Sequence, residues 1–304
     1  MPRRSNYLNG LSLEELMAEQ ERRAMALDPV VFARRLGFKP DPWQVRLLRS
    51  KTQFRLLNCS RQIGKSETTS ISVLHLALFE PGSLILLISP SDRQSGEIFR
   101  KVLHWLNVFM PKRSLPEENK TTLELSNGSR IVSLPSQEST IRSFSGVRRI
   151  VADEASRVPD PLYHAVRPML MVNHGDFWGL SSPFGKRGWF YNEWANLGED
   201  GHASDVDNGW ERYEVPVTHV PRLMHDPEVR KFLAKERASK GERWFNQEYM
   251  CRFVELEDGV FTDKLVDAAF DPKVTPIFDG EVTPAEVDTG IATLDFGELE
   301  AEVT

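Results

Sequence analysis

A short polar stretch between an apolar run and a helical pattern carries residue types that bind phosphate. Residues 59–66 read Cys-Ser-Arg-Gln-Ile-Gly-Lys-Ser and follow the apolar run at 54–59. Gly64 lets the backbone curl around a phosphate group, and the first N–H groups of the following helix point toward the anion. Lys65 can reach β and γ phosphates, and the Ser66 hydroxyl can ligate Mg²⁺. The segment therefore predicts a Walker A phosphate-binding loop.

The predicted loop departs from the usual motif at one position, and two arginines are candidates for a role at the bound nucleotide. Cys59 stands where the motif usually has its first glycine. Arg61 adds a positive charge that either stabilises phosphate charge during reaction or holds the loop through a surface salt bridge. Arg142, in the polar loop at 139–146, is either an arginine finger for a neighbouring subunit's nucleotide or a solvated side chain. The loop residues expected to bind nucleotide are Ser60, Gln62, Ile63, Gly64, Lys65 and Ser66.

Two adjacent acids end a second apolar run. Asp153 and Glu154 follow the strand pattern at 149–152. The carboxyl ends of parallel strands gather at one edge of a sheet, so these acids are expected beside the phosphate loop. Asp153 suits the Mg²⁺ shell, and Glu154 suits the general base that polarises an attacking water. The pair favours hydrolysis over transfer to a bound acceptor.

Short apolar runs alternate with helical patterns through most of the chain. This alternation predicts an α/β fold with a mostly parallel sheet flanked by helices. Asn127-Gly128 predicts a hairpin between strands at 122–126 and 129–134. Further strands are expected at 54–59, 83–89, 149–152, 176–182 and 211–217, and helices at 12–27, 29–36, from 42, at 67–79, 91–110 and 226–250.

The composition bounds the class of protein. A chain of 304 residues, 40% hydrophobic and 27% charged, is typical of a soluble globular protein with one sizeable core. No run approaches the ~20 apolar residues of a membrane span, and no signal-peptide core follows Arg3 and Arg4, so a cytosolic location is expected. Two cysteines are too few for a disulfide framework. The net charge of -6 means that any DNA contact is local.

Four segments, in this order and spacing, resemble the large terminase subunits of tailed bacteriophages. They are residues 60–66, 142–146, 151–155 and 180–185. The resemblance implies a RecA/ASCE-like P-loop NTPase with ATP and Mg²⁺ as cofactors. It also implies that ATP hydrolysis drives double-stranded DNA into a procapsid in the host cytoplasm. The implied partners are the portal protein, the small terminase subunit and further copies of the chain in a ring, a pentamer.

The resemblance assigns roles to further residues. Ser182 matches a coupling motif that senses the γ-phosphate, and Gln44 matches an adenine-recognising segment. Asp295 matches the metal-binding aspartate that opens an RNase H-like nuclease. Such a nuclease needs several carboxylates, so DNA cleavage by this chain is not expected. The expected domains are an arm at 1–27, an ATPase domain at 28–255 with a helical lid at about 195–255, and a linker and incomplete nuclease at 256–304.

Two other functions stay open at this point. One is a helicase or another nucleic-acid-stimulated P-loop ATPase, although no second RecA-like domain follows residue 176. The other is an inactive fragment that binds the portal or small subunit without turnover. The DNA-contacting surface also stays open, with candidate basic pairs at 34–35, 112–113 and 186–187.

Overall fold

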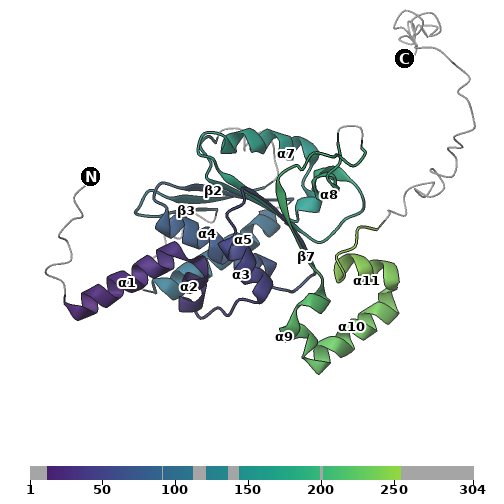
Figure 1. The fold of residues 1–304 in the computed structure, drawn as a ribbon, viewed down its shortest axis with the longest axis horizontal. Helices are drawn as coiled ribbons and strands as arrows, with labels where there is room; N and C mark the ends of the chain where they lie inside the picture. Colours follow the sequence, from purple (N-terminus) through teal and green to yellow (C-terminus); the bar gives the residue numbers. More distant parts are fainter. Residues whose placement is uncertain (1–11, 91, 112–120, 136–143, 199–200, 255–304) are drawn as a thin grey trace, which may run out of the picture. The chain divides into compact units, whose positions relative to one another are not determined.

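A seven-stranded sheet forms the centre of the fold (Figure 1). The computed structural model describes residues 12–90, 92–111, 121–135, 144–198 and 201–254. The strand order is β3-β4-β2-β5-β6-β1-β7, and every pairing is parallel except the antiparallel pair β3 and β4. The strands are β1 (Phe54–Cys59), β2 (Leu84–Ser89), β3 (Thr122–Glu124), β4 (Arg130–Pro135), β5 (Arg149–Asp153), β6 (Asp176–Ser181) and β7 (Trp210–Val215). The predicted α/β class and its strands are confirmed.

Helices cover both faces of this sheet. In Figure 1, α7 and α8 lie on one side, and α3, α4 and α5 lie on the other. The helices are α1 (Leu13–Leu27), α2 (Pro29–Arg35), α3 (Pro42–Arg49), α4 (Lys65–Phe79), α5 (Asp92–Phe109), α7 (Asp160–Val166), α8 (Gly188–Ala195), α9 (Pro221–Met224), α10 (Pro227–Lys240) and α11 (Glu242–Glu248). Short 3-10 helices lie at η1 (Ala155–Arg157), η2 (Arg167–Leu170) and η3 (Val217–His219). No described helix is long and apolar enough to cross a lipid bilayer.

Alternate strand residues point into two separate cores. Leu57 of β1 and Val151 of β5 belong to the core under α4 and α5, whereas their neighbours Leu56 and Ile150 belong to the core under α7 and α8. A strand buried on both faces must be apolar at nearly every position. This explains the unbroken apolar run of β2, which the sequence predicts as a buried central strand.

The C-terminal helices differ in detail from the prediction. The helix expected at 226–250 is divided by Gly241, whose φ of 84° ends α10 and starts α11. Strand β7 pairs with β1 in the main sheet although it lies within the range predicted for the lid at about 195–255. Helices α9 to α11 pack around a small cluster of their own, made of Val217, Leu233, Phe245 and Tyr249. The helical segment that leaves the sheet therefore begins only after β7.

The chain divides at residue 256 into two units, of which the second, residues 257–304, lies outside the described residues. The predicted linker and Asp295 lie outside them as well.

Gly175 immediately precedes β6 and offers a test of the sheet packing. A Cβ at this position would lie 2.4 Å from the Val147 carbonyl oxygen and 2.7 Å from a Leu170 methyl carbon. We expect Gly175→Ala to lower the free energy of unfolding by about 1 to 3 kcal/mol, because backbone atoms must move to relieve the overlap. Gly96→Ala is the matched control: a Cβ there meets nothing within 4 Å, and the change within α5 should raise stability by about 0.5 to 1 kcal/mol. Urea unfolding measures both, and equal stability of the two variants contradicts the packing described.

Candidate active site

The candidate phosphate loop connects β1 to α4. Gln62 and Gly64 have positive φ values of 62° and 90°, and Gly64 is the residue before the first turn of α4. Glycine adopts this left-handed backbone more readily than other residues because it has no Cβ atom. The first N–H groups of a helix lack intrahelical acceptors, so α4 presents donors and the positive end of its dipole at Lys65 and Ser66.

Cys59 replaces the usual glycine without disturbing this loop. It is the last residue of β1, is fully buried, and belongs to the hydrophobic core under α4. Burial raises the pKa of its thiol to about 12, so the side chain is a neutral, small apolar group at pH 7. The next residue, Ser60, donates its backbone N–H to the Val215 carbonyl at 3.0 Å. The departure from the motif therefore falls on a core position.

Lys65 and the two acids meet at one edge of the sheet. The Lys65 Nζ lies 3.5 Å from Glu154 Oε1. Burial lowers the pKa of Lys65, but the carboxylates of Glu154 and Asp153 outweigh burial and raise it above its ordinary value. The lysine is therefore a charged ammonium that faces two carboxyl groups.

Asp153 and Glu154 occupy different environments at the end of β5. Burial is the main cause that raises the pKa of Asp153 to about 6; the charge of Lys65 opposes this rise, and the neighbouring charge of Glu154 adds to it. Glu154 is about a quarter exposed and has a left-handed backbone with φ of 50°. Such a conformation is uncommon outside glycine and turns the chain sharply out of the strand. The turn is held by the Glu154 N–H, which donates to Asp153 Oδ1 at 3.1 Å.

Three serines connect the ends of β5 and β6. The hydroxyl groups of Ser156 and Ser181 are 2.7 Å apart. Ser156 Oγ also donates to the Ser182 carbonyl at 3.0 Å. The predicted coupling residue, Ser182, is thus buried beside a residue that lies two positions after Glu154. Ser156 was not singled out from the sequence, because a lone serine after a strand has no local signal.

Gln44 lies against the phosphate loop. Its side chain is buried, accepts the Asp41 N–H at 2.7 Å and donates to the Gly64 carbonyl at 3.5 Å. Arg222 of α9 reaches the same place: it donates to the Ile63 carbonyl at 2.7 Å and pairs with Asp41 at 2.9 Å. Arg222 lies 159 residues from Ile63 in the chain, so sequence spacing could not indicate this contact.

Arg61 forms a salt bridge with Glu248 of α11, and its backbone N–H donates to the Glu248 carbonyl at 3.2 Å. The Arg61 side chain is 54% exposed, whereas that of Glu248 is 5% exposed. The sequence left two roles open for Arg61, stabilising phosphate charge or holding the loop through a salt bridge. The contact with Glu248 corresponds to the second. The other candidate arginine, Arg142, and the candidate metal ligand Asp295 lie outside the described residues.

Magnesium would find oxygen ligands at this edge. Mg²⁺ takes oxygen ligands, keeps several waters and is bound by one or two protein groups together with substrate phosphates. The Ser66 hydroxyl and the Asp153 carboxylate fit that donor set. Across the described residues, no three histidine, cysteine, aspartate or glutamate side chains cluster in a way that could hold a metal ion.

The fold and this edge of the sheet define a P-loop NTPase-like protein, and comparison with known families makes the assignment specific. Residues 56–266 match the family described as terminase large subunit, T4likevirus-type, N-terminal. The chain belongs to the terminase large subunit family. The resemblance stated from the four sequence motifs is confirmed.

Individual relatives agree with the family. The terminase large subunit of Thermus virus P23-45 is 26% identical over 249 residues, which cover 75% of this chain and 51% of the relative. The chain thus spans about half the length of this curated relative. The large terminase ATPase domain of Thermus phage P74-26 has a similar fold, with a TM-score of 0.58 at 24% identity over 73% of this chain and 97% of that domain. The large terminase of another thermophilic bacteriophage, in complex with ADP, has a TM-score of 0.55 at 13% identity, over 71% of this chain and 54% of that one.

The raised pKa of Asp153 predicts a pH dependence of stability. A carboxyl group with a higher pKa in the folded than in the unfolded protein binds its proton more tightly when folded. Its contribution to stability therefore falls as pH rises from about 4 to about 6. The Asp153→Asn variant lacks this loss. The free energy of unfolding of the variant minus that of the parent should therefore increase by up to about 3 kcal/mol from pH 4 to pH 7.

Urea unfolding in metal-free buffer measures this difference, with Asp205→Asn, an exposed aspartate, as the control. A difference between Asp153→Asn and the parent that stays constant with pH contradicts the assigned environment.

Proposed function

We propose that this chain hydrolyses ATP and uses the energy to move double-stranded viral DNA into a procapsid. The observation that carries the proposal is the 3.5 Å approach of Lys65 Nζ to Glu154 Oε1, at the edge where β1, β6 and β5 end. Membership of the terminase large subunit family supports it. So does the fold shared with the large terminase of the second thermophilic bacteriophage, which has been solved with ADP and with ATP-gamma-S.

The ion pair between Lys65 and Glu154 gives the binding step its logic. A triphosphate carries more negative charge than one carboxylate, so it would bind the Lys65 ammonium in place of Glu154 and release that carboxylate. The freed carboxylate then orients a water toward the γ-phosphate and accepts its proton. Mg²⁺, held by Ser66 and Asp153, would neutralise phosphate charge. Binding of the substrate thus prepares the base for the reaction.

The loop's other contacts offer routes by which hydrolysis would reach the rest of the protein. Ser156 and Ser181 connect the Glu154 turn to the end of β6 and to Ser182. On the other side, Arg61 and Arg222 join the phosphate loop to α11 and α9. A change at the γ-phosphate therefore has two hydrogen-bonded paths away from the site. We assign Ser182 to the first path, and a helical lid, the predicted segment at about 195–255, to the second.

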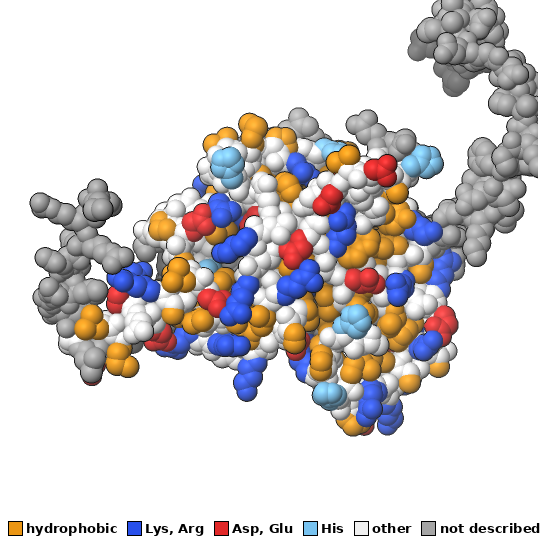
Figure 2. Space-filling view, viewed as in Figure 1, with side chains coloured by type: hydrophobic (Ala, Val, Ile, Leu, Met, Phe, Trp, Pro, Cys, Tyr) orange, Lys and Arg blue, Asp and Glu red, His pale blue; other side chains and the backbone are white. Residues whose placement is uncertain are grey.

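DNA contact would be local. On the face shown in Figure 2, basic side chains are interspersed with acidic ones. A small basic group surrounds Phe184, which follows β6: the guanidinium groups of Arg157 and Arg187 lie 3.9 and 5.0 Å from the centre of its ring. Both arginines are exposed, and Arg157 adds a third basic residue to the candidate pair at 186–187.

The proposal includes the assembly that the family resemblance implies. The chain would act in the cytoplasm of the infected host as a ring, a pentamer, together with the portal protein and the small terminase subunit. Arg142 would supply positive charge to the nucleotide of a neighbouring subunit. ATP hydrolysis would then depend on assembly, because an isolated subunit lacks this charge.

Two substitutions test the ATPase. Lys65→Ala should abolish measurable ATP binding. Glu154→Gln should retain binding but lower kcat at least about 100-fold, because a general base contributes about that much or more. Exposed Lys231→Ala and Glu228→Gln on α10 are matched controls and should keep the parent rate. ATP hydrolysis is measured on the chain assembled with the portal protein, with and without duplex DNA. Activity that survives Glu154→Gln rejects the assigned base, and an assembled parent without turnover favours a partner-binding fragment.

Gln44 provides a separate test of nucleotide recognition. Its amide already uses one donor and one acceptor on the protein, which leaves one N–H and one lone pair for an adenine edge. Gln44→Ala should raise KM for ATP about tenfold and leave KM for GTP nearly unchanged. Gln20→Ala, an exposed glutamine of α1, is the control. An equal rise for both nucleotides means that Gln44 shapes the loop and does not read the base.

A further inference from the structure

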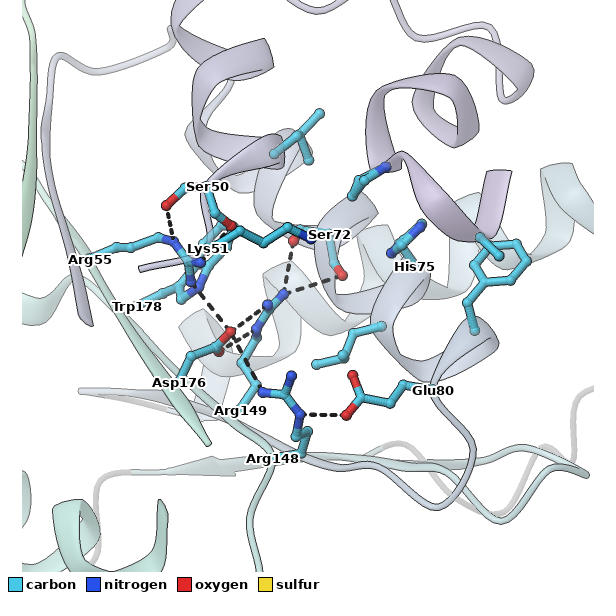
Figure 3. Close-up of a pocket in the computed structure, with 15 residues that line it drawn as sticks. Ser50, Lys51, Arg55, Ser72, His75, Glu80, Arg148, Arg149, Asp176 and Trp178 are labelled. Carbon is cyan, nitrogen blue, oxygen red and sulfur yellow. Dashed lines mark hydrogen bonds and ion pairs between the residues drawn. The ribbon is translucent and has the colours of Figure 1, made fainter. Parts of the chain in front are cut away.

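A cavity of about 240 Å³ lies at the opposite end of the strands from Lys65 and Glu154. Its lining includes Arg55, at the start of β1, and Arg149 and Asp176, the first residues of β5 and β6 (Figure 3). Ser72 of α4, the helix that Lys65 begins, also lines it. The two sites are separated by the length of a strand, about 15 to 20 Å at ~3.3 Å per residue.

The cavity contains more buried positive than negative charge. Arg55 and Arg149 are 3% and 7% exposed, and both bind the one carboxylate of Asp176, at 3.3 Å and 2.6 Å. Arg148 lies 3.9 Å from the same carboxylate, and its shorter contact, at 2.6 Å, is with Glu80. The lining residues therefore include four basic side chains, with Lys51 the fourth, and two acids.

The remaining groups around the cavity do not cancel this excess. Burial lowers the pKa of His75, so its ring is neutral at pH 7. Glu211 reaches Arg55 only through the Ser50 hydroxyl, and it is also paired with Arg46 at 3.2 Å. A buried charge without a full counter-charge is costly, and such a site calls for an ion.

Unused hydrogen-bond donors accompany the charge. The hydrogen bonds of Arg55 to Ser50 and Asp176 engage three of its five N–H groups. Trp178 lies between the two buried arginines, with their guanidinium carbons 4.8 and 4.6 Å from its ring centre. Its indole Nε1 is buried and has no hydrogen-bond partner among the described residues. A buried donor of this kind is satisfied by an acceptor from a ligand or water.

We propose that this cavity binds a phosphate group, held by Arg55, Arg149 and the Trp178 indole. Phosphate presents several acceptor oxygens and matches the planar donor fork of arginine. The accessible basic groups that attract the anion are two further lining residues, the exposed Lys51 and the partly exposed Arg148. The phosphate is either free inorganic phosphate or part of a DNA backbone. The site depends on none of the residues assigned to ATP hydrolysis, so it stands or falls separately from the proposed function.

Titration calorimetry with inorganic phosphate at constant ionic strength tests this site. The full chain carries Lys65→Ala, which removes phosphate binding at the candidate Walker loop, and it should still bind one phosphate. Adding Lys51→Ala with Arg148→Ala should weaken that binding about tenfold, because these substitutions remove the two accessible positive charges of the cavity. Adding Lys231→Ala with Lys235→Ala removes the same charge from α10 and should change nothing. Absence of phosphate binding, or equal binding by the two sets of variants, overturns the proposal.

Competition identifies the source of the phosphate. A short duplex DNA that displaces inorganic phosphate from the Lys65→Ala protein, and binds more weakly when Lys51 and Arg148 are replaced, supports a backbone phosphate as the ligand. Phosphate binding that the duplex leaves unchanged supports free inorganic phosphate.

Discussion

The site depends on the placement of β6 between β1 and β5. With this order, three parallel strands end side by side, and their polar ends converge on one edge. Lys65 comes from the first strand's loop, Asp153 and Glu154 from the third, and Ser181 and Ser182 from the strand between them. The two carboxyl groups stabilise the charged Lys65 ammonium in these partly buried surroundings. A ligand with more negative charge can then displace Glu154 from it. The proposed chemistry, and its connection to the rest of the protein, follow from this arrangement.

The same three strands are fixed at their other ends by charge. Arg55, Arg149 and Asp176 lie on β1, β5 and β6, so a single buried carboxylate joins the two outer strands to the middle one. Arg149 also donates to Ser72 of α4 at 2.8 Å. The helix that carries Lys65 at its start is thus tied to the sheet two turns later. Ion pairs thus hold this end of the three strands together, and the Lys65–Glu154 pair lies at the opposite end.

Much of the fold follows from sequence pattern. Continuous apolar runs predict buried strands because each face of the sheet meets helices, and Asn127-Gly128 predicts the antiparallel pair that β3 and β4 form. The meeting of Lys65 with Glu154 also follows, since parallel strands share an edge. The break at Gly241 did not follow, because a glycine within a charged helical pattern has no unique interpretation. Helix α8 was also not predicted from the sequence.

Tertiary contacts account for what the sequence could not predict about the site. The packing of α9, α11 and the turn after β5 determines the contacts of three residues near the site, and no local sequence pattern indicates them. These residues are Arg222, Ser156 and Glu248, the partner of Arg61. Cys59 departs from the glycine that is usual at this position of the motif. Its burial in the core explains why a small apolar residue fits there. The cationic cavity was also unforeseen, since Arg55, Arg149 and Asp176 begin three strands that are distant in sequence.

A structure of the chain with a non-hydrolysable ATP analogue and Mn²⁺ tests the central claim most directly. The account predicts that the β and γ phosphates contact Lys65 Nζ, that the anomalous Mn²⁺ peak lies beside Ser66 and Asp153, and that Glu154 has left the lysine. Nucleotide bound elsewhere, or phosphates in the loop with the ion pair between Lys65 and Glu154 intact, would contradict it.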